Sequence, residues 1–165
     1  MIEVMIRNTV GCQTAEAVMI ETIRCVLRDH QVAHGEVSLA IIDDAAMQTL
    51  NRTHLQHDYA TDVLSFLLDR DHDTLEGEVI VSAETASQAA DEYGWSSSDE
   101  LLLYVIHGTL HLVGYDDRSA ADRRSMRDRE AHYLNLAGIR IPDDSRQLHF
   151  NPRDDEENTS REAPV

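Results

Sequence analysis

Residues 97–117 read SSDELLLYVIHGTLHLVGYDD, and the predicted fold is built around them. Between Leu101 and Val113 almost every position is apolar, on all sides of a helix and not along a single stripe. A helix that is apolar all round is buried in a protein core. Ser97 and Glu100 have the spacing of a capping box, and Gly114 is the residue type that most readily ends a helix. The sequence therefore predicts a central, buried helix that ends at Gly114.

The segments on either side of this helix show strand and helix patterns. Strands are predicted at residues 2–7, 37–42, 63–68 and 77–81, where β-branched residues or period-2 alternation occur. Further helices are predicted at residues 14–30, after the cap Asp43-Asp44, at 83–93 and at 119–137. Residues 51–62 are predicted to be a histidine-rich loop, and residues 69–77 an acidic turn region. In the first helix, the predicted inward positions are Ala15, Val18, Met19, Ile23, Val26 and Leu27.

These elements predict one domain. Four strands and about five helices, interleaved early and with helices grouped late, favour a mixed α/β or α+β fold on one sheet. The strand order stays open at this point. Residues 1–142 form the predicted domain, whereas residues 143–165 are rich in Asp, Glu, Arg, Asn and Pro and are predicted to be a disordered acidic tail.

The composition excludes several classes of function. The 165-residue chain has a net charge of −17, and all 14 of its basic residues are arginine. Without lysine there is no P-loop and no Schiff-base chemistry. A role on nucleic acid would need a local basic patch. Five arginines follow the central helix and could form one, or could pair with acidic neighbours on a solvated face: Arg118, Arg123, Arg124, Arg127 and Arg129.

The sequence shows no apolar run long enough to cross a bilayer and no secretory signal pattern at its start. Its two cysteines, Cys12 and Cys25, would lie about 20 Å apart if both were on one helix, too far to form a disulfide. Reduced thiols fit the cytoplasm. We therefore expect a cytoplasmic protein with no membrane partner.

The central helix carries a metal-ligand pattern, with His107 and His111 four residues apart and Asp117 beyond a glycine. Residues i and i+4 share one helix face, so two imidazoles can reach one ion, and Gly114 lets the chain turn back to bring Asp117 to it. Two nitrogens and one oxygen leave a fourth position for water, as in a catalytic zinc centre. The sequence predicts one Zn²⁺ per chain, with another divalent transition metal as the alternative.

A histidine pair at this spacing can also be ordinary helix packing. The pattern partly resembles the metzincin signature H-E-x-x-H-x-x-G-x-x-H, but Gly108 stands where those proteases have their glutamate base. Glycine transfers no proton, which argues against peptide hydrolysis by that route.

Four segments together resemble the YbeY family of bacterial endoribonucleases that mature ribosomal RNA. They are HGTLHLVGYDD at 107–117, TDVLSF at 61–66, GEVIVSAETA at 77–86 and the loop 51–58. The resemblance covers about residues 1–140. It implies a single α/β domain with a central four-stranded sheet, and a metal site of three histidines, two of which fall on His107 and His111 and the third on Asp117.

The chain departs from the family pattern at two places. Asp117 replaces the third histidine and adds negative charge beside the metal, so a bound water should be less acidified. His54-Leu55 stands where the family commonly has an aromatic residue followed by a functional arginine, and leucine cannot stabilise phosphate charge. His54 or His57 could supply a replacement donor, or could be solvated loop histidines.

The resemblance implies a single-strand-specific, metal-dependent endoribonuclease that processes the 3′ end of 16S ribosomal RNA and acts in ribosome quality control. Its partners would be ribosomal RNA, the small ribosomal subunit and a ribosome-associated GTPase. A metal-bound water, or the metal as Lewis acid, would do the chemistry, and no other catalytic group is assigned. Contacts to RNA are expected from Arg118, Arg123, Arg124, Arg127, His54 and His57. The alternative is a ribosome-assembly or RNA-binding factor with a structural metal and weak or lost nuclease activity.

Overall fold

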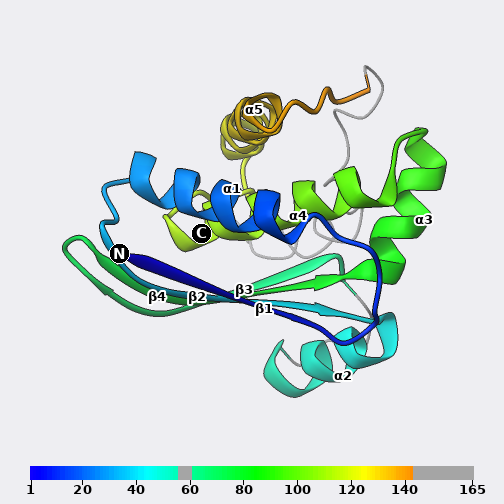
Figure 1. Cartoon of the computed structure of the whole chain (residues 1–165), viewed down its shortest axis with the longest axis horizontal. Coiled ribbons are helices and arrows are strands. Elements are labelled where there is room, and N and C mark those ends of the chain that lie inside the picture. The colour runs from blue at the N-terminus through cyan, green and yellow to red at the C-terminus, as the bar shows by residue number, and fades with distance from the viewer. Residues whose placement is uncertain (56–60, 143–165) are drawn as a thin grey trace, which may run out of the picture.

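The computed structural model describes residues 1–55 and 61–142, which contain four strands and five helices (Figure 1). In chain order these are β1 (Ile2–Asn8), α1 (Glu16–Asp29), β2 (His34–Ile42), α2 (Asp44–Leu55), β3 (Val63–Asp71), β4 (Thr74–Ser82), α3 (Ala83–Tyr93), α4 (Ser97–Leu112) and α5 (Ala120–Leu136).

The strands form one mixed sheet in the order β1-β2-β4-β3. β1 and β4 both run parallel to β2, whereas β3 pairs antiparallel with β4. The parallel pairs need crossover connections, and these contain α1 and α2. The prediction of a single α/β domain with a four-stranded mixed sheet and about five helices is therefore confirmed.

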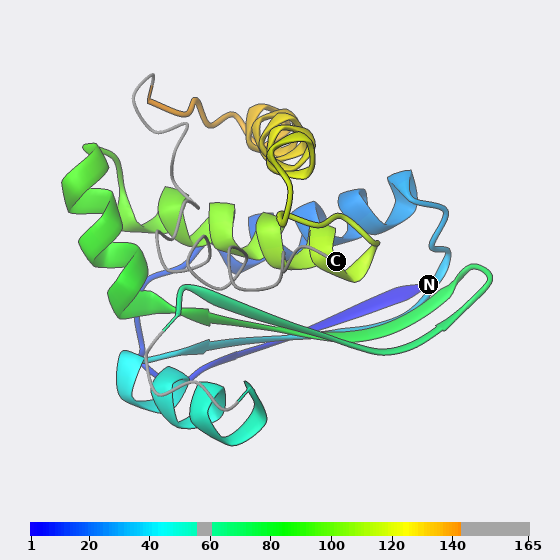
Figure 2. The same ribbon diagram turned by 180° about the vertical axis from the view of Figure 1, so that it is seen from behind.

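Helices cover both faces of the sheet to different extents. α1 and α4 lie on one face, α3 stands beside the end of α4, and α5 forms an outer layer over α4 (Figure 1). On the opposite face, α2 covers a small apolar cluster around Met47, and among the described residues it is the one helix on that face (Figure 1). Viewed from behind, the β3–β4 hairpin reaches past the helices (Figure 2).

α4 is the central helix of the main core, as its composition predicts. Every residue from Glu100 to Leu110 is buried, and so is Leu112. Its apolar side chains pack between the sheet residues Val79 and Val81 and residues of α1 such as Ile23. Burial of this many large side chains, at about 1.5–3 kcal/mol each, makes α4 the helix on which the domain depends.

Helix starts agree with the sequence at α2, α3 and α5, where Ser119 caps α5 as predicted, and they differ at α1 and α4. The Asp43 carboxylate accepts a hydrogen bond from the Ala46 amide at 2.8 Å, and Ser82 caps α3 as predicted. At α4, however, the cap is Ser96 and not Ser97, and its hydroxyl accepts from the amide of Asp99. Glu100 is not a capping residue: it is fully buried and accepts a hydrogen bond from the Trp95 indole at 2.7 Å.

Three other sequence predictions are wrong. Residues 69–77 are not a turn region: apart from a turn at His72 and Asp73 they continue β3 and β4, because cross-strand pairing extends the hairpin. Residues 51–55 are helical, since α2 runs on to Leu55. Two positions predicted to face inward do not: Ala15 precedes α1 and is exposed, and Val18, in the first turn of that helix, is 40% exposed outside its buried stripe.

The two cysteines are not on one helix. Cys12 precedes α1 and Cys25 lies within it; both are free, half-buried and packed against the core. The predicted tail, residues 143–165, lies outside the described residues. No helix in the described part of the chain is long and apolar enough to span a membrane.

Candidate metal centre

The position of α4 on the sheet depends on Gly108. A Cβ atom built at this residue would lie 2.6 Å from Val79 Cγ1 and 2.9 Å from Val63 Cγ2. The Ser65 hydroxyl donates a hydrogen bond to the Gly108 carbonyl at 2.9 Å, which a larger residue would disturb. Where a metzincin has its glutamate, this chain therefore has a close helix-to-sheet contact, and a glutamate side chain would collide with Val79 there.

The three residues predicted as metal ligands lie together. His107 and His111 project from one face of α4, and Asp117 reaches them from the loop after that helix. The two Nε2 atoms are 3.0 Å apart, and Asp117 Oδ2 lies 3.4 Å from that of His107 and 3.5 Å from that of His111. Bonds of 2.0–2.1 Å in a tetrahedron place ligand atoms about 3.3 Å apart. The group therefore fits a metal ion of zinc's size and geometry.

The loop after α4 brings Asp117 back to the helix. Gly114 has φ +103°, in the left-handed region that other residues rarely adopt, and here the chain leaves the helix. The Arg123 guanidinium, from α5, donates to the carbonyls of Asp117 at 3.4 Å and Arg118 at 3.1 Å. Arg123 therefore holds the backbone of the loop that carries the carboxylate ligand.

Both histidines are oriented through their Nδ1 atoms. His107 Nδ1 lies 2.6 Å from Glu130 Oε1, and His111 Nδ1 lies 2.9 Å from the Tyr115 carbonyl oxygen. Because carboxylate and carbonyl oxygens only accept hydrogen bonds, each Nδ1 carries the proton, and each Nε2 faces the other predicted metal ligands. Such outer contacts fix ring orientation and raise the basicity of metal-bound histidines.

The electrostatics of the group favour a cation. Burial lowers the pKa of His107, but its contacts with Asp117 and Glu130 outweigh burial and raise that pKa well above its ordinary value. Contacts from His107 and His111 lower the pKa of the Asp117 carboxyl well below its ordinary value. The carboxyl groups of Asp117 and Glu130 therefore lie against the imidazoles, an arrangement that suits a bound cation.

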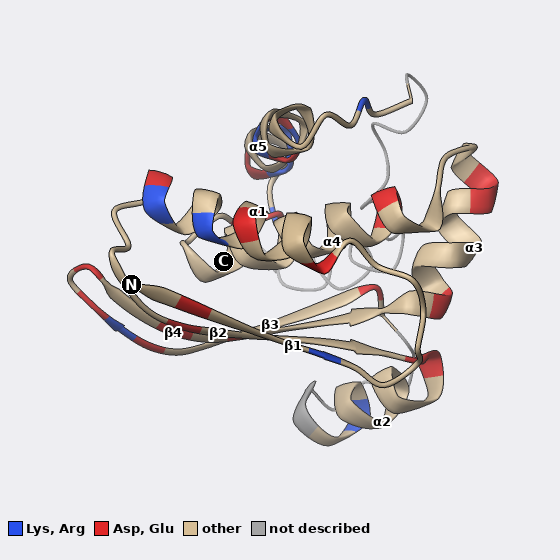
Figure 3. Cartoon of the chain, in the orientation of Figure 1, with Lys and Arg blue, Asp and Glu red and all other residues tan. Residues whose placement is uncertain are grey.

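The residues predicted to contact RNA have different surroundings. Arg118 is exposed, with an 84% accessible side chain 3.4 Å from Asp116. Arg124 is exposed and Arg127 half-buried on α5, which carries both signs of charge (Figure 3). His57 lies outside the described residues. His54 lies in α2, and its side chain is not described.

Sequence reasoning missed Glu130. Its carboxylate is 3% exposed although it belongs to a helix that is otherwise rich in solvated charge. The helical spacing indicates that Glu130 faces inward, because it is four residues after Met126 and three before Tyr133, and both of these are buried on the inner side of α5. A carboxylate in an inward stripe needs a buried partner, and here that partner is His107.

The chain is thus a single-domain α/β protein with an open His-His-Asp group that could hold a metal ion. The comparison with known families is more specific. A family described as "Endoribonuclease YbeY" matches residues 5–138. This chain belongs to the YbeY endoribonuclease family.

Individual relatives agree with this family. Proteins described as "Endoribonuclease YbeY" are 43% identical over 133 residues in Rhodopirellula baltica and 40% identical over 126 residues in Salinibacter ruber. These alignments cover 74% and 69% of this chain, and 69% and 80% of the relatives. A solution structure of a Thermotoga maritima protein matches the fold with a TM-score of 0.57 at 24% identity, over 82% of this chain and 87% of that one.

Proposed function

We propose that this protein is a zinc-dependent, single-strand-specific endoribonuclease that acts in the maturation of 16S ribosomal RNA at its 3′ end and in ribosome quality control. The observation that carries the proposal is the tetrahedral spacing of His107, His111 and Asp117 in a chain of an endoribonuclease family. Ribosomal RNA in the small ribosomal subunit is the proposed substrate, and the cytoplasm the proposed compartment.

The ligand set supports a catalytic ion in preference to a purely structural one. Three protein ligands leave one position of a tetrahedron open, whereas structural zinc sites use four. A cation bound there would supply Lewis acidity toward a phosphoryl oxygen or lower the pKa of water. Asp117 is 38% exposed and His111 28% exposed, so the group is open on one side while His107 is buried. An RNA strand can therefore approach from the side of Asp117 and His111.

The chain's own side chains have defined tasks in this site. Glu130 and the Tyr115 carbonyl orient the two imidazoles, and Arg123 holds the loop that carries Asp117. The exposed Arg118 and Arg124 provide positive charge directly after the ligand loop, and arginine suits bidentate contact with phosphate.

Metal analysis and RNA cleavage test the proposal together. The purified full chain should contain about one zinc per molecule, and His111→Ala should lose both the metal and the cleavage of single-stranded ribosomal RNA fragments. The matched control is His72→Asn, which changes an exposed histidine in the hairpin turn. A native chain without stoichiometric metal would contradict the site.

The second candidate is a ribosome-assembly or RNA-binding factor with a structural metal. It is favoured by the negative charge of Asp117 in the ligand set and by Leu55 at the position of the family's arginine. Equal residual cleavage by the native chain and by His111→Ala, with metal bound only to the native chain, would support this alternative.

A further inference from the structure

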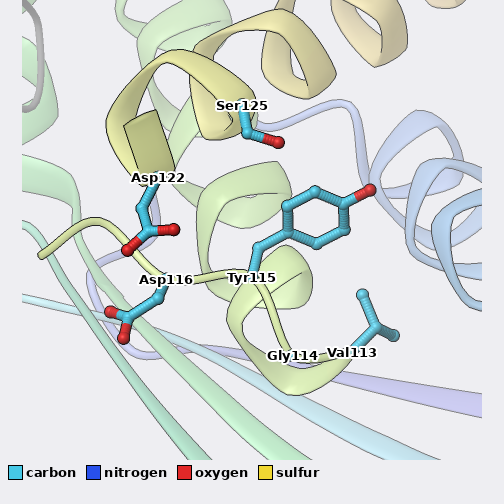
Figure 4. A pocket seen from close by; sticks show the side chains of 6 residues that line it. All are labelled: Val113, Gly114, Tyr115, Asp116, Asp122 and Ser125. Carbon is cyan, nitrogen blue, oxygen red and sulfur yellow. The ribbon is translucent and has the colours of Figure 1, made fainter. Parts of the chain in front are cut away.

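A hollow is formed in part by the loop that carries Asp117. Its volume is about 230 Å³, and it lies between the loop after α4 and the first turns of α5. The lining residues are Val113, Gly114, Tyr115, Asp116, Asp122 and Ser125. Figure 4 shows the Tyr115 ring nearly face-on, with the Ser125 hydroxyl above it and the carboxylates of Asp116 and Asp122 on one side. The hollow is smaller than the roughly 300–1,000 Å³ of drug-sized pockets, which suits one planar heterocycle.

This pocket is joined to the metal group through the backbone. The Tyr115 carbonyl accepts the hydrogen bond from His111 Nδ1, and Asp116 directly precedes the ligand Asp117. Consecutive Cα atoms are about 3.8 Å apart, so the pocket wall and the ligand loop are one short segment. A molecule in the pocket would therefore be a neighbour of a group bound at the metal.

The Tyr115 ring is held rigidly. Its hydroxyl lies 3.2 Å from His30 Nε2, and the two rings pack edge to face with centroids 5.3 Å apart. His30 Nδ1 in turn lies 2.7 Å from the Val26 carbonyl, so Nδ1 donates and Nε2 accepts the tyrosine proton. A fixed aromatic ring at the wall of a pocket is a platform on which a nucleobase can stack.

The polar groups of the pocket select hydrogen-bond donors. In their ionised form, the carboxylates of Asp116 and Asp122 accept hydrogen bonds and donate none, and they repel phosphate. Each has acceptor capacity left: Asp116 accepts from the Asp117 amide and lies near Arg118, and Asp122 accepts from the Ser119 amide at 3.4 Å. Guanine presents two adjacent donors, N1–H and the N2 amino group, whereas uracil presents one N–H between two carbonyl acceptors.

We propose that this pocket binds one unpaired base of the RNA, next to the phosphate at the metal, and that it prefers guanine. This inference rests on the proposed function for its substrate class. It assigns base selectivity to Tyr115, Asp116 and Asp122, and leaves phosphate contacts to the metal group and the exposed arginines.

A binding assay tests the pocket without requiring cleavage. Fluorescein-labelled 2′-O-methyl hexanucleotides, either all uridine or with a single guanosine, adenosine or cytidine, are titrated with the zinc-loaded full chain and followed by anisotropy. The single-guanosine oligomer should bind about five- to a hundredfold more tightly than the all-uridine oligomer, the range that a good bidentate base contact supplies. Equal binding of the two, or a preference for uridine, would overturn the proposal.

Variants locate the preference. Asp122→Asn keeps an acceptor for the Ser119 amide, so α5 retains its start, but it removes the charge from the pocket; it should reduce the guanosine preference at least severalfold. Asp116→Asn is the second variant, in case the first perturbs the helix. The control Asp128→Asn removes the same charge from an exposed position of α5 and should keep the native preference. If both pocket variants keep it too, the assignment is wrong.

Cleavage separates this inference from the proposed function. If the native chain cuts single-stranded RNA but all oligomers bind alike, the nuclease assignment stands and the base pocket fails. If guanosine is preferred in binding and Asp122→Asn abolishes that preference while no RNA is cut, the pocket stands and the nuclease assignment fails.

Discussion

Glu130 on α5 and His107 on α4 form a buried pair, with the carboxylate oxygen 2.6 Å from Nδ1 and both side chains about 5% accessible or less. The pair connects the outermost helix to the metal group, because the same imidazole presents Nε2 to Asp117 and His111. The position of α5 and the orientation of the His107 ring therefore depend on each other.

This pair predicts that Glu130→Gln weakens metal binding. Glutamine keeps the size of the side chain but removes the charge that orients and polarises His107, and loss of such a contact typically lowers metal affinity about 10–100-fold. Competition with a chromogenic chelator measures the change. Asp128→Asn, an exposed charge change in the same helix, should leave the affinity as it is; an unchanged affinity in Glu130→Gln would contradict the orienting role.

The close contact at Gly108 predicts that Gly108→Ala destabilises the domain. Alanine favours a helix by about 1 kcal/mol, but its Cβ would lie 2.6 Å from the stiff side chain of Val79. Overpacking of this kind costs about 1–3 kcal/mol, and the Ser65 hydrogen bond would be displaced as well. Urea unfolding should show a lower midpoint with an unchanged slope. A midpoint equal to or above the native one would show that the helix is not held this closely.

The raised pKa of His107 predicts that metal binding releases a proton. A metal ligand must be a neutral imidazole, whereas His107 without metal keeps its proton at neutral pH. The apparent metal affinity should therefore fall as the pH is lowered, and about one proton per metal should be released near pH 7. Calorimetry in two buffers with different ionisation enthalpies measures this number. Glu130→Gln, which removes one cause of the raised pKa, should release fewer protons; no release from the native chain would contradict the charge assignment.

The charge of Asp117 predicts how activity depends on pH. Asp117→His would supply a third imidazole and remove one negative charge from beside the ion, so a bound water should lose its proton more readily. The pH–rate profile of RNA cleavage should shift toward lower pH, with metal still bound. Asp117→Ala is the comparison, since it removes the ligand and should lower metal affinity. If the pH–rate profile of Asp117→His equals that of the native chain, the charge of this ligand has no role in setting the pH dependence.

The exposed arginines after the ligand loop predict a shallow salt dependence of RNA binding. The chain is acidic overall, so few phosphates are neutralised, and removing Arg124 should lower the slope of log K against log salt by roughly 0.7 for single strands. The control Arg7→Ala removes an exposed charge from β1, away from the loop. An equal effect of the two substitutions would assign the contacts to net charge and not to this surface.

Much of the fold was accessible from local patterns. The apolar composition of α4, the alternation of β1, and the caps at Asp43 and Ser82 are properties of neighbouring residues along the chain, and all were confirmed. The errors occurred where pairing between distant segments overrides local composition, as in the acidic residues of the β3–β4 hairpin. The strand order, with β4 between β2 and β3, also depends on such pairing.

Local sequence was enough to predict that His107, His111 and Asp117 lie together, because helical periodicity places the two histidines on one face and a single turn at Gly114 returns Asp117 to them. The contacts that hold these three residues in place come from tertiary packing. Glu130 is 23 residues from His107, and His30 is 85 residues from Tyr115. Contacts over such separations arise from the packing of α5 and α1 around α4, and no short sequence pattern contains them.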